Sequence, residues 1–232
     1  MFKQVFCVSG LALLVSTATL IGQTRPHYRD FMLGSNLSSI SAQVKASAAD
    51  VRTIRQRPAL IQDLQWRVPY FVVDSNQPGK DPVQQITFSF YNDQLYRMAV
   101  NYDRQRIEGM TDADMISALT DVYGPVTTPT PKPKTPQAFA SSLDVTSGIL
   151  VSQWGNAEYS VVLLRSSFGP GYQVVVTSTP LEALARSADA EAVRLDVLEA
   201  PVRELARKKQ EADAALASQE KARAANKATF RP

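Results

Sequence analysis

Residues 86–102 carry the strictest pattern in the sequence. Apolar side chains occupy every second position from Ile86 to Phe90 and again from Tyr96 to Tyr102, with a short polar connection between the two runs. Successive side chains of a β-strand point to opposite faces, so a period of two indicates a strand with one buried face. The connection is short enough to join the two strands directly. We therefore predict an antiparallel hairpin.

A helix follows this hairpin, and both of its ends are marked in the sequence. Thr111 is placed to accept the free amide hydrogens of the first turn, and Asp114 three residues later completes a capping box. Apolar residues then recur at helical spacing from Met115 to Val122. Gly124 favours the left-handed conformation that ends a helix, and the proline after it prevents the helix from continuing.

The second half of the chain repeats this order of strands followed by a helix. Strands are predicted over residues 149–154, 159–164 and 172–177, and a helix begins at Thr179-Pro180. The last two strands contain runs in which every residue is apolar. Such runs are typical of strands in the centre of a sheet that is covered on both faces. We therefore predict that the two halves share one sheet.

The N-terminal half contains two further predicted helices. Apolar residues recur at spacings of four, three and four from Leu33 to Val44, and Ser35 or Asn36 is placed to cap the first turn. A second helical stretch is predicted over residues 51–57 from the spacing of Val51 and Ile54. It should end before Pro58, because a proline disfavours the helical conformation of the residue before it.

Residues 66–72 alternate as a strand, and Pro69 predicts that this strand lies at the edge of the sheet. Together the elements predict an α+β fold: a mostly antiparallel sheet of about six strands in two meander-plus-helix halves, with a long charged C-terminal helix. A duplicated unit would give this order, although residue identity between the halves is slight. A meander followed by a helix is also a common way to cover a sheet face.

Changes in composition divide the chain. The segment 126–137 carries four prolines and two lysines and predicts an extended linker. The predicted divisions are a signal segment (1–18), an extended lead-in (19–35), an α+β half (36–125), the proline-rich linker (126–137), a second β-rich half of the same domain (138–182) and a charged, alanine-rich helical tail (183–232).

The N-terminus has the pattern of an export signal. Lys3 supplies a positive charge, residues 5–15 are apolar apart from a serine and a glycine, and Ser16-Thr17-Ala18 supplies small residues for a peptidase. We predict cleavage after Ala18 and a periplasmic or secreted protein. The alternative is an uncleaved anchor of residues 5–22 in the inner membrane, because 18 residues just reach spanning length.

Cysteine and histidine occur once each, which excludes several kinds of chemistry. Cys7 lies in the predicted signal, so the mature chain would have no disulfide, thiol nucleophile or cysteine metal site. His27 lies beside a proline near the cleavage site, and we interpret it as a solvated loop residue. Histidine triads and histidine zinc sites are therefore excluded, and no cofactor is predicted.

Four carboxylates between the hairpin and the helix are the candidate ligand-binding residues: Asp103, Glu108, Asp112 and Asp114. Calcium takes several oxygen ligands from one flexible loop, and glycan hydrolases use a pair of carboxylates. Against calcium binding, the spacing of these carboxylates matches no EF-hand loop. Aspartates in a first helical turn are also favoured by the helix dipole. The stronger interpretation is structural, and no catalytic or metal-binding residue is assigned.

The tail from residue 183 onward is alanine-rich and highly charged. Six apolar residues fit a seven-residue repeat: Leu181, Leu184, Leu195, Leu198, Val202 and Leu205. Glu191, Lys209 and Gln219 interrupt the repeat, so its sustained part lasts only about two heptads. Pro201 predicts a kink or a restart of the helix, and beyond Leu216 there is little to bury. We interpret the tail as a projecting helix by which the protein meets another envelope protein.

The 25 basic and 22 acidic residues nearly balance, which gives no indication of nucleic-acid binding. We expect membrane contact only through the N-terminal segment, if it is uncleaved. The sequence thus predicts a non-enzymatic exported envelope protein with a binding or scaffolding role. A carboxylate-dependent hydrolase and a calcium- or small-ligand-binding module remain as alternatives. An enzyme is disfavoured because the usual bases and nucleophiles are missing.

Overall fold

The structure is a computed structural model that describes residues 26–68, 81–127, 148–167, 171–229 and 231. Its elements are β1 (His27–Tyr28), β2 (Phe31–Met32), α1 (Leu37–Val44), a short 3-10 turn (Ala48–Asp50), β3 (Val51–Arg55), β4 (Ile61–Arg67), β5 (Val83–Tyr91), β6 (Gln94–Tyr102), α2 (Asp112–Tyr123), β7 (Ile149–Gly155), β8 (Tyr159–Arg165), β9 (Tyr172–Ser178) and α3 (Thr179–Thr229).

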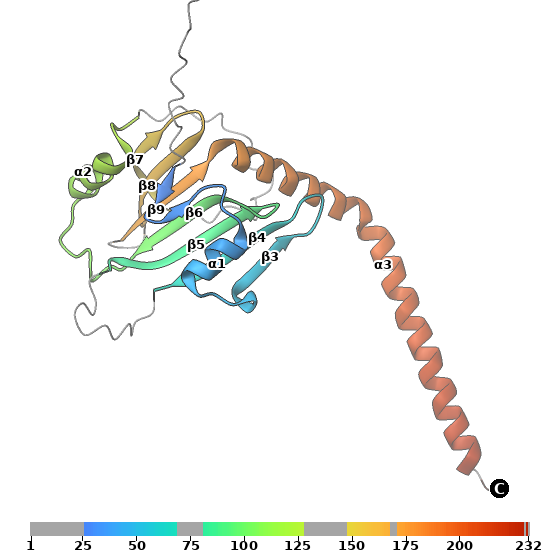
Figure 1. Ribbon diagram of the computed structural model, residues 1–232. Coiled ribbons are helices and arrows are strands. Elements are labelled where there is room, and N and C mark those ends of the chain that lie inside the picture. Colours follow the sequence, from blue (N-terminus) through green and yellow to red (C-terminus); the bar gives the residue numbers. More distant parts are fainter. Residues whose placement is uncertain (1–25, 69–80, 128–147, 168–170, 230, 232) are drawn as a thin grey trace, which may run out of the picture.

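Seven of the strands form one antiparallel sheet in the order β3-β4-β5-β6-β9-β8-β7, and β1 and β2 pair separately (Figure 1). The α+β prediction is therefore confirmed, with seven strands in the main sheet where about six were expected. The two halves share this sheet, as predicted, because β6 pairs with β9 from Arg97 opposite Thr177 to Asn101 opposite Gln173.

The main apolar core lies on one face of this sheet. Every second residue of the central strands points to it, among them Phe88 and Met98. Both α1 and α2 pack on this face, with Ile40 and Met115 buried in the same cluster. The short β1–β2 hairpin adds further cover, since the ring of Phe31 lies edge-on to that of Phe88 at 4.9 Å between centroids.

Local signals in the sequence fix several of these elements. The capping box at the start of α2 is confirmed: the Thr111 hydroxyl accepts from the Asp114 amide, and the Asp114 carboxylate accepts from the Thr111 amide. Asn36 caps α1 through its side chain, which is one of the two predicted caps. Asn92 and Asp93 both have positive φ and form the two-residue connection of the β5–β6 hairpin.

Two predictions near the N-terminal edge of the sheet are wrong. The helix expected over residues 51–57 is strand β3, whose β-branched residues pair antiparallel with β4. Of the strand expected over residues 66–72, residues 69–72 lie outside the described residues, and the strand that contains Trp66 starts at Ile61 and ends at Arg67. It is flanked by β3 and β5, so it is not an edge strand.

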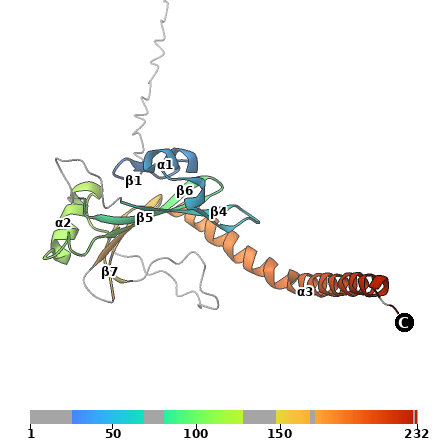
Figure 2. The ribbon, with the colours of Figure 1, turned by 90° about the horizontal axis from the view of Figure 1, so that it is seen from below.

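The opposite face of the sheet is covered at one end by the start of α3. Ala185 and Ala188 are buried there against Tyr96 and Ile61. Figure 2 shows α1 on one side of the sheet and α3 leaving it on the other. Beyond this contact α3 extends away from the body and changes direction along its length (Figure 1). Pro201 lies inside a continuous helix, so the predicted restart does not occur.

Several predicted segments fall wholly or largely outside the described residues. They are the signal or anchor (residues 1–18 or 5–22) and most of the proline-rich linker (126–137). Of the predicted lead-in, residues 26–35 are described and include β1 and β2. Among the helices that the structure describes, none combines the length and the apolar character needed to cross a membrane.

Candidate functional site

The four predicted carboxylates lie along the segment that joins β6 to α2, but they do not form one cluster of ligands. Asp103 accepts hydrogen bonds from the backbone amides of Gln105 and Arg106 and so shapes a turn. Glu108 is exposed. In the described part of the chain, no group of three or more acidic, histidine or cysteine side chains is placed to hold a metal ion.

Asp114 is occupied by the helix cap. Hydrogen bonds from the backbone and side chain of Thr111 hold the pKa of the Asp114 carboxyl below its usual value. These bonds satisfy amide groups that have no partner within the helix, as expected for a first-turn aspartate. The hydrogen bonds of Asp114 are therefore those of a helix-capping residue, in agreement with the interpretation that its role is structural.

Asp112 makes contacts that the sequence did not indicate. Its carboxylate accepts a hydrogen bond of 2.5 Å from the Tyr172 hydroxyl and another of 3.1 Å from the Arg165 guanidinium. These partners lie 60 and 53 positions away in the sequence, on β9 and β8. Burial, and then the bond to Asp112, raises the pKa of Tyr172 to about 12, so the hydroxyl is a neutral donor at physiological pH.

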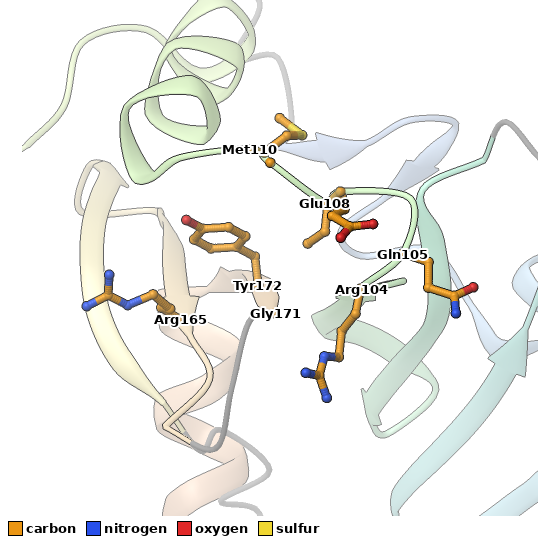
Figure 3. A pocket seen from close by; sticks show the side chains of 9 residues that line it. Arg104, Gln105, Glu108, Met110, Arg165, Gly171 and Tyr172 are labelled. Carbon is orange, nitrogen blue, oxygen red and sulfur yellow. The ribbon is translucent and has the colours of Figure 1, made fainter.

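An open groove of about 600 Å³ lies beside this pair. Figure 3 shows Tyr172 and Arg165 on one side of the groove, and Glu108 and Arg104 on the other. Of the four predicted carboxylates, only Glu108 lines the groove. Glycoside hydrolysis of the kind considered needs two carboxylates that face each other. The groove therefore offers a binding surface with two cationic side chains, and the described residues do not give it a catalytic pair.

The distal part of α3 is the second candidate site. All described residues of α3 from position 200 to 229 are exposed. Leu198, Val202 and Leu205 recur at spacings of four and three, and each is at least 60% exposed. Arg207 forms ion pairs with Glu204 and Glu211 on the same helix, and these pairs stabilise its exposed part. An exposed apolar stripe on a free helix is a surface that a second helix can cover.

A third group of residues was missed by the sequence analysis and lies on the sheet face that carries α3. The structure describes five buried polar side-chain atoms without a hydrogen-bond partner: Asp63 Oδ1, Ser89 Oγ, Tyr96 OH, Arg97 Nη2 and Gln173 Oε1.

All five residues belong to strands of the main sheet, and none of them belongs to the main apolar cluster. The all-apolar runs of β8 and β9 predicted cover on both faces of the sheet, but the alternation within β5 and β6 indicates only one buried face for those two strands. The burial of these polar side chains therefore could not be read from the sequence.

Comparisons with protein-family models, with curated proteins and with solved structures gave no match. The choice between functions therefore depends on the geometry of these three regions.

Proposed function

We propose that this protein is a non-enzymatic exported protein of the envelope, and that it binds or scaffolds another envelope protein through the distal part of α3. The exposed stripe of Leu198, Val202 and Leu205 on a helix that extends away from the sheet supports this proposal. The occupant that fits the stripe is an amphipathic helix of the partner, because apolar residues at spacings of three and four match the seam of a helix pair.

The contacts that hold the first part of α3 to the sheet also support the proposal, because they leave the distal part of the helix free for a partner. The Arg55 guanidinium donates to Asp189 at 2.8 Å and to Asp196 at 3.3 Å, and Arg57 pairs with Glu199. These contacts join the first part of the helix to the β3 edge and to the loop after it. The helix after residue 199 makes no such contact with the described part of the body, so a partner could approach it from any side.

The test is site-specific photo-crosslinking in cells that export the full chain. A photoreactive residue at position 205 should give a discrete crosslinked product. The same residue at Leu184, which is also exposed on α3 but lies where the helix contacts the sheet, should not. Once the product is identified, the double variant V202S/L205S should weaken its binding by roughly 10-fold or more, because each apolar side chain buried at an interface contributes about 1.5–3 kcal/mol.

A second measurement compares the mass of residues 19–200 with that of residues 19–232 by light scattering, with and without the partner. Truncation after Ala200 removes the free part of α3 and leaves the anchored part intact. The proposal would be contradicted if a photoreactive residue placed in turn at positions 198, 202 and 205 gave no crosslinked product, and if truncation left both the mass and the partner binding unchanged. Protease accessibility in spheroplasts, with the mass of the mature N-terminus, tests export and cleavage separately.

A further inference from the structure

The apolar stripe of distal α3 belongs to a longer face of the same helix. Steps of three and four residues lead along this face through Leu184, Ala188, Glu191, Leu195, Leu198, Val202, Leu205, Lys209, Ala212 and Leu216. All of these positions lie within one continuous helix, Thr179–Thr229. Residues at such spacings share one face of a helix, and we call this face the α3 seam.

The α3 seam is open to solvent even where the helix lies on the sheet. Leu184 is 51% exposed, Leu198 is 60% exposed, and the side chain of Glu191 is 40% exposed. Ala188 is the exception, because it is buried against the sheet. From position 200 onward every described residue of the helix is exposed. A second helix can therefore approach along most of the seam.

Two charged residues interrupt the apolar pattern of the seam, and their charges are opposite. Glu191 lies nine positions before Ala200, and Lys209 lies nine positions after it. Glu191 forms an exposed ion pair with Arg194 on its own helix. In the part of the chain that the structure describes, Lys209 forms no ion pair, although Asp213 lies one turn beyond it. A charge at a core position of a helix pair costs stability unless the partner balances it.

The α3 seam is complementary to itself when a second copy of the helix runs antiparallel. A two-fold axis at the level of Ala200 places positions at equal distances before and after it opposite one another. The facing pairs are Leu198 with Val202, Leu195 with Leu205, Glu191 with Lys209, Ala188 with Ala212, and Leu184 with Leu216. Each leucine of the seam then meets a leucine or a valine, and each charge meets its opposite.

A parallel pair in register does not have this match. Glu191 would face the same glutamate of the other copy, and Lys209 would face the same lysine. Like charges that meet across an interface are strongly unfavourable. The charges of the seam therefore favour the antiparallel arrangement.

The remaining features of the helix are compatible with this arrangement. Pro201 lies next to the centre of the pair and is not a seam position, so the bend expected at a proline falls at the same level in both copies. Arg194 and Lys208 flank the seam, but each pairs with a glutamate of its own helix. Their contribution to the pairing is therefore small.

We propose that two copies of this chain pair antiparallel through the α3 seam and cover each other's apolar stripe. The partner of distal α3 must then displace the second copy before it can bind. The displacement rests on the proposed function, whereas the pairing itself can be tested without any partner.

The first test is sedimentation equilibrium on residues 19–232, which should have the mass of two chains. K209E places a glutamate opposite a glutamate and should weaken the dimer by roughly 10-fold or more, and E191K should do the same with two lysines. The double variant E191K/K209E restores opposite charges, so its affinity should return to within about 3-fold of wild type.

K221E is the matched control, because Lys221 is exposed on the same helix but lies off the seam. It makes the same change of charge as K209E and should leave the affinity unchanged. A wild type that is monomeric at its highest soluble concentration would overturn the pairing. A double variant as weak as the two single ones, or equal effects of K209E and K221E, would also overturn it.

The second test is disulfide crosslinking, which is possible because residues 19–232 contain no cysteine. A mixture of L184C and L216C should form a disulfide between the two variants. L216C alone should form none, because its two copies lie roughly 50 Å apart along an antiparallel pair. A disulfide in L216C alone would show a parallel pair and would overturn the proposal.

Photo-crosslinking in cells separates the second copy from the partner. Another protein should crosslink at position 205 and not at 184, whereas a second copy should give a product of two identical chains at both positions. We expect products of both kinds. Two-chain products without any product from another protein would contradict the partner and support the pairing. A purified wild type that gives no two-chain product at either position would overturn the pairing and leave the partner unaffected.

Discussion

Asp63 shows how a single half-buried carboxyl affects the stability of this protein. Burial raises the pKa of Asp63, while the nearby Ser89 hydroxyl and the charges of Arg97 and Arg52 act in the opposite direction. The folded protein therefore holds this proton more tightly than the unfolded chain does. Between the unfolded and folded pKa values the folded state binds more protons, so this contribution to stability is largest in acid and falls as the pH rises through that interval.

We predict that D63N raises the melting temperature at pH 7, because it replaces a half-buried carboxylate with a neutral side chain of the same shape. The expected gain is on the order of 2–4 °C, the shift that about 1 kcal/mol gives in a domain of this size. The gain should disappear as the pH falls below about 4, where the wild-type carboxyl is protonated in both states. Thermal melts from pH 3.5 to 7.5 measure this.

D121N is the matched control, because Asp121 is exposed on α2. A gain in D63N that is equal at pH 3.5 and pH 7 would contradict the electrostatic explanation. A loss at pH 7 would show that the charge of Asp63 stabilises the fold.

Residue-scale features differ in how far the sequence predicts them. The capping box of Thr111 and Asp114 was predicted correctly, because its geometry depends on a spacing of three residues. The contacts of Asp112 with Tyr172, and the burial of Arg97, depend on strands that are distant in the sequence. No local pattern encodes such contacts, so the candidate sites were only partly visible before the structure.

At the scale of elements, the same distinction explains the error at β3. Val51 and Ile54 are three residues apart, which fits a helix face as well as it fits an irregular strand. The pairing with β4 decides the outcome, and it contains a register shift between Thr53 and Arg55. The predicted strand began at residue 66, whereas β4 begins at Ile61. Its first half contains the polar residues Asp63 and Gln65, which lie on the second face of the sheet and which give no strand signal in the sequence.

Arg55 on β3 links the sheet to the first part of α3. Its guanidinium contacts Asp189, which is 3% exposed, and Asp196. We predict that R55M destabilises the protein by about 2 kcal/mol, the usual cost of losing a hydrogen bond to a buried charged group. Urea denaturation measures this, and hydrogen exchange should show faster exchange in the first part of α3.

R194M is the matched control for this prediction. Arg194 pairs with Glu191 entirely on the exposed surface of the same helix. Its loss should change stability little, since exposed pairs within one helix contribute little. Equal effects of R55M and R194M would show that α3 is not held to the sheet by the Arg55 contacts.

At the scale of the whole molecule, the two halves of the chain form one sheet, with β6 and β9 as the strands that join them. The proline-rich segment divides the sequence into two halves, and the sheet continues from one half to the other, as the apolar runs of β8 and β9 predicted. Each half carries one of the two tryptophans, Trp66 on β4 and Trp154 on β7. Trp154 is fully buried and donates to Thr120 on α2.

This arrangement predicts a single cooperative unfolding transition. In the single-tryptophan variants W66F and W154F, the remaining tryptophan reports on one half each. The two halves should unfold together within each variant, so fluorescence and circular dichroism should give coincident urea midpoints. A fluorescence midpoint that differs from the dichroism midpoint in either variant would show that the halves unfold as separate units.

The β6–β9 pairing also sets the order in which the chain can fold. The β5–β6 and β8–β9 hairpins are local, whereas Asn101 and Gln173 meet across 72 positions of sequence. Closing a loop of that length costs on the order of 4 kcal/mol of chain entropy before the central strands can pair. Until then β6 and β9 each present an unpaired edge to other chains. The newly made protein is therefore most prone to aggregate after its hairpins have formed and before its two central strands have met.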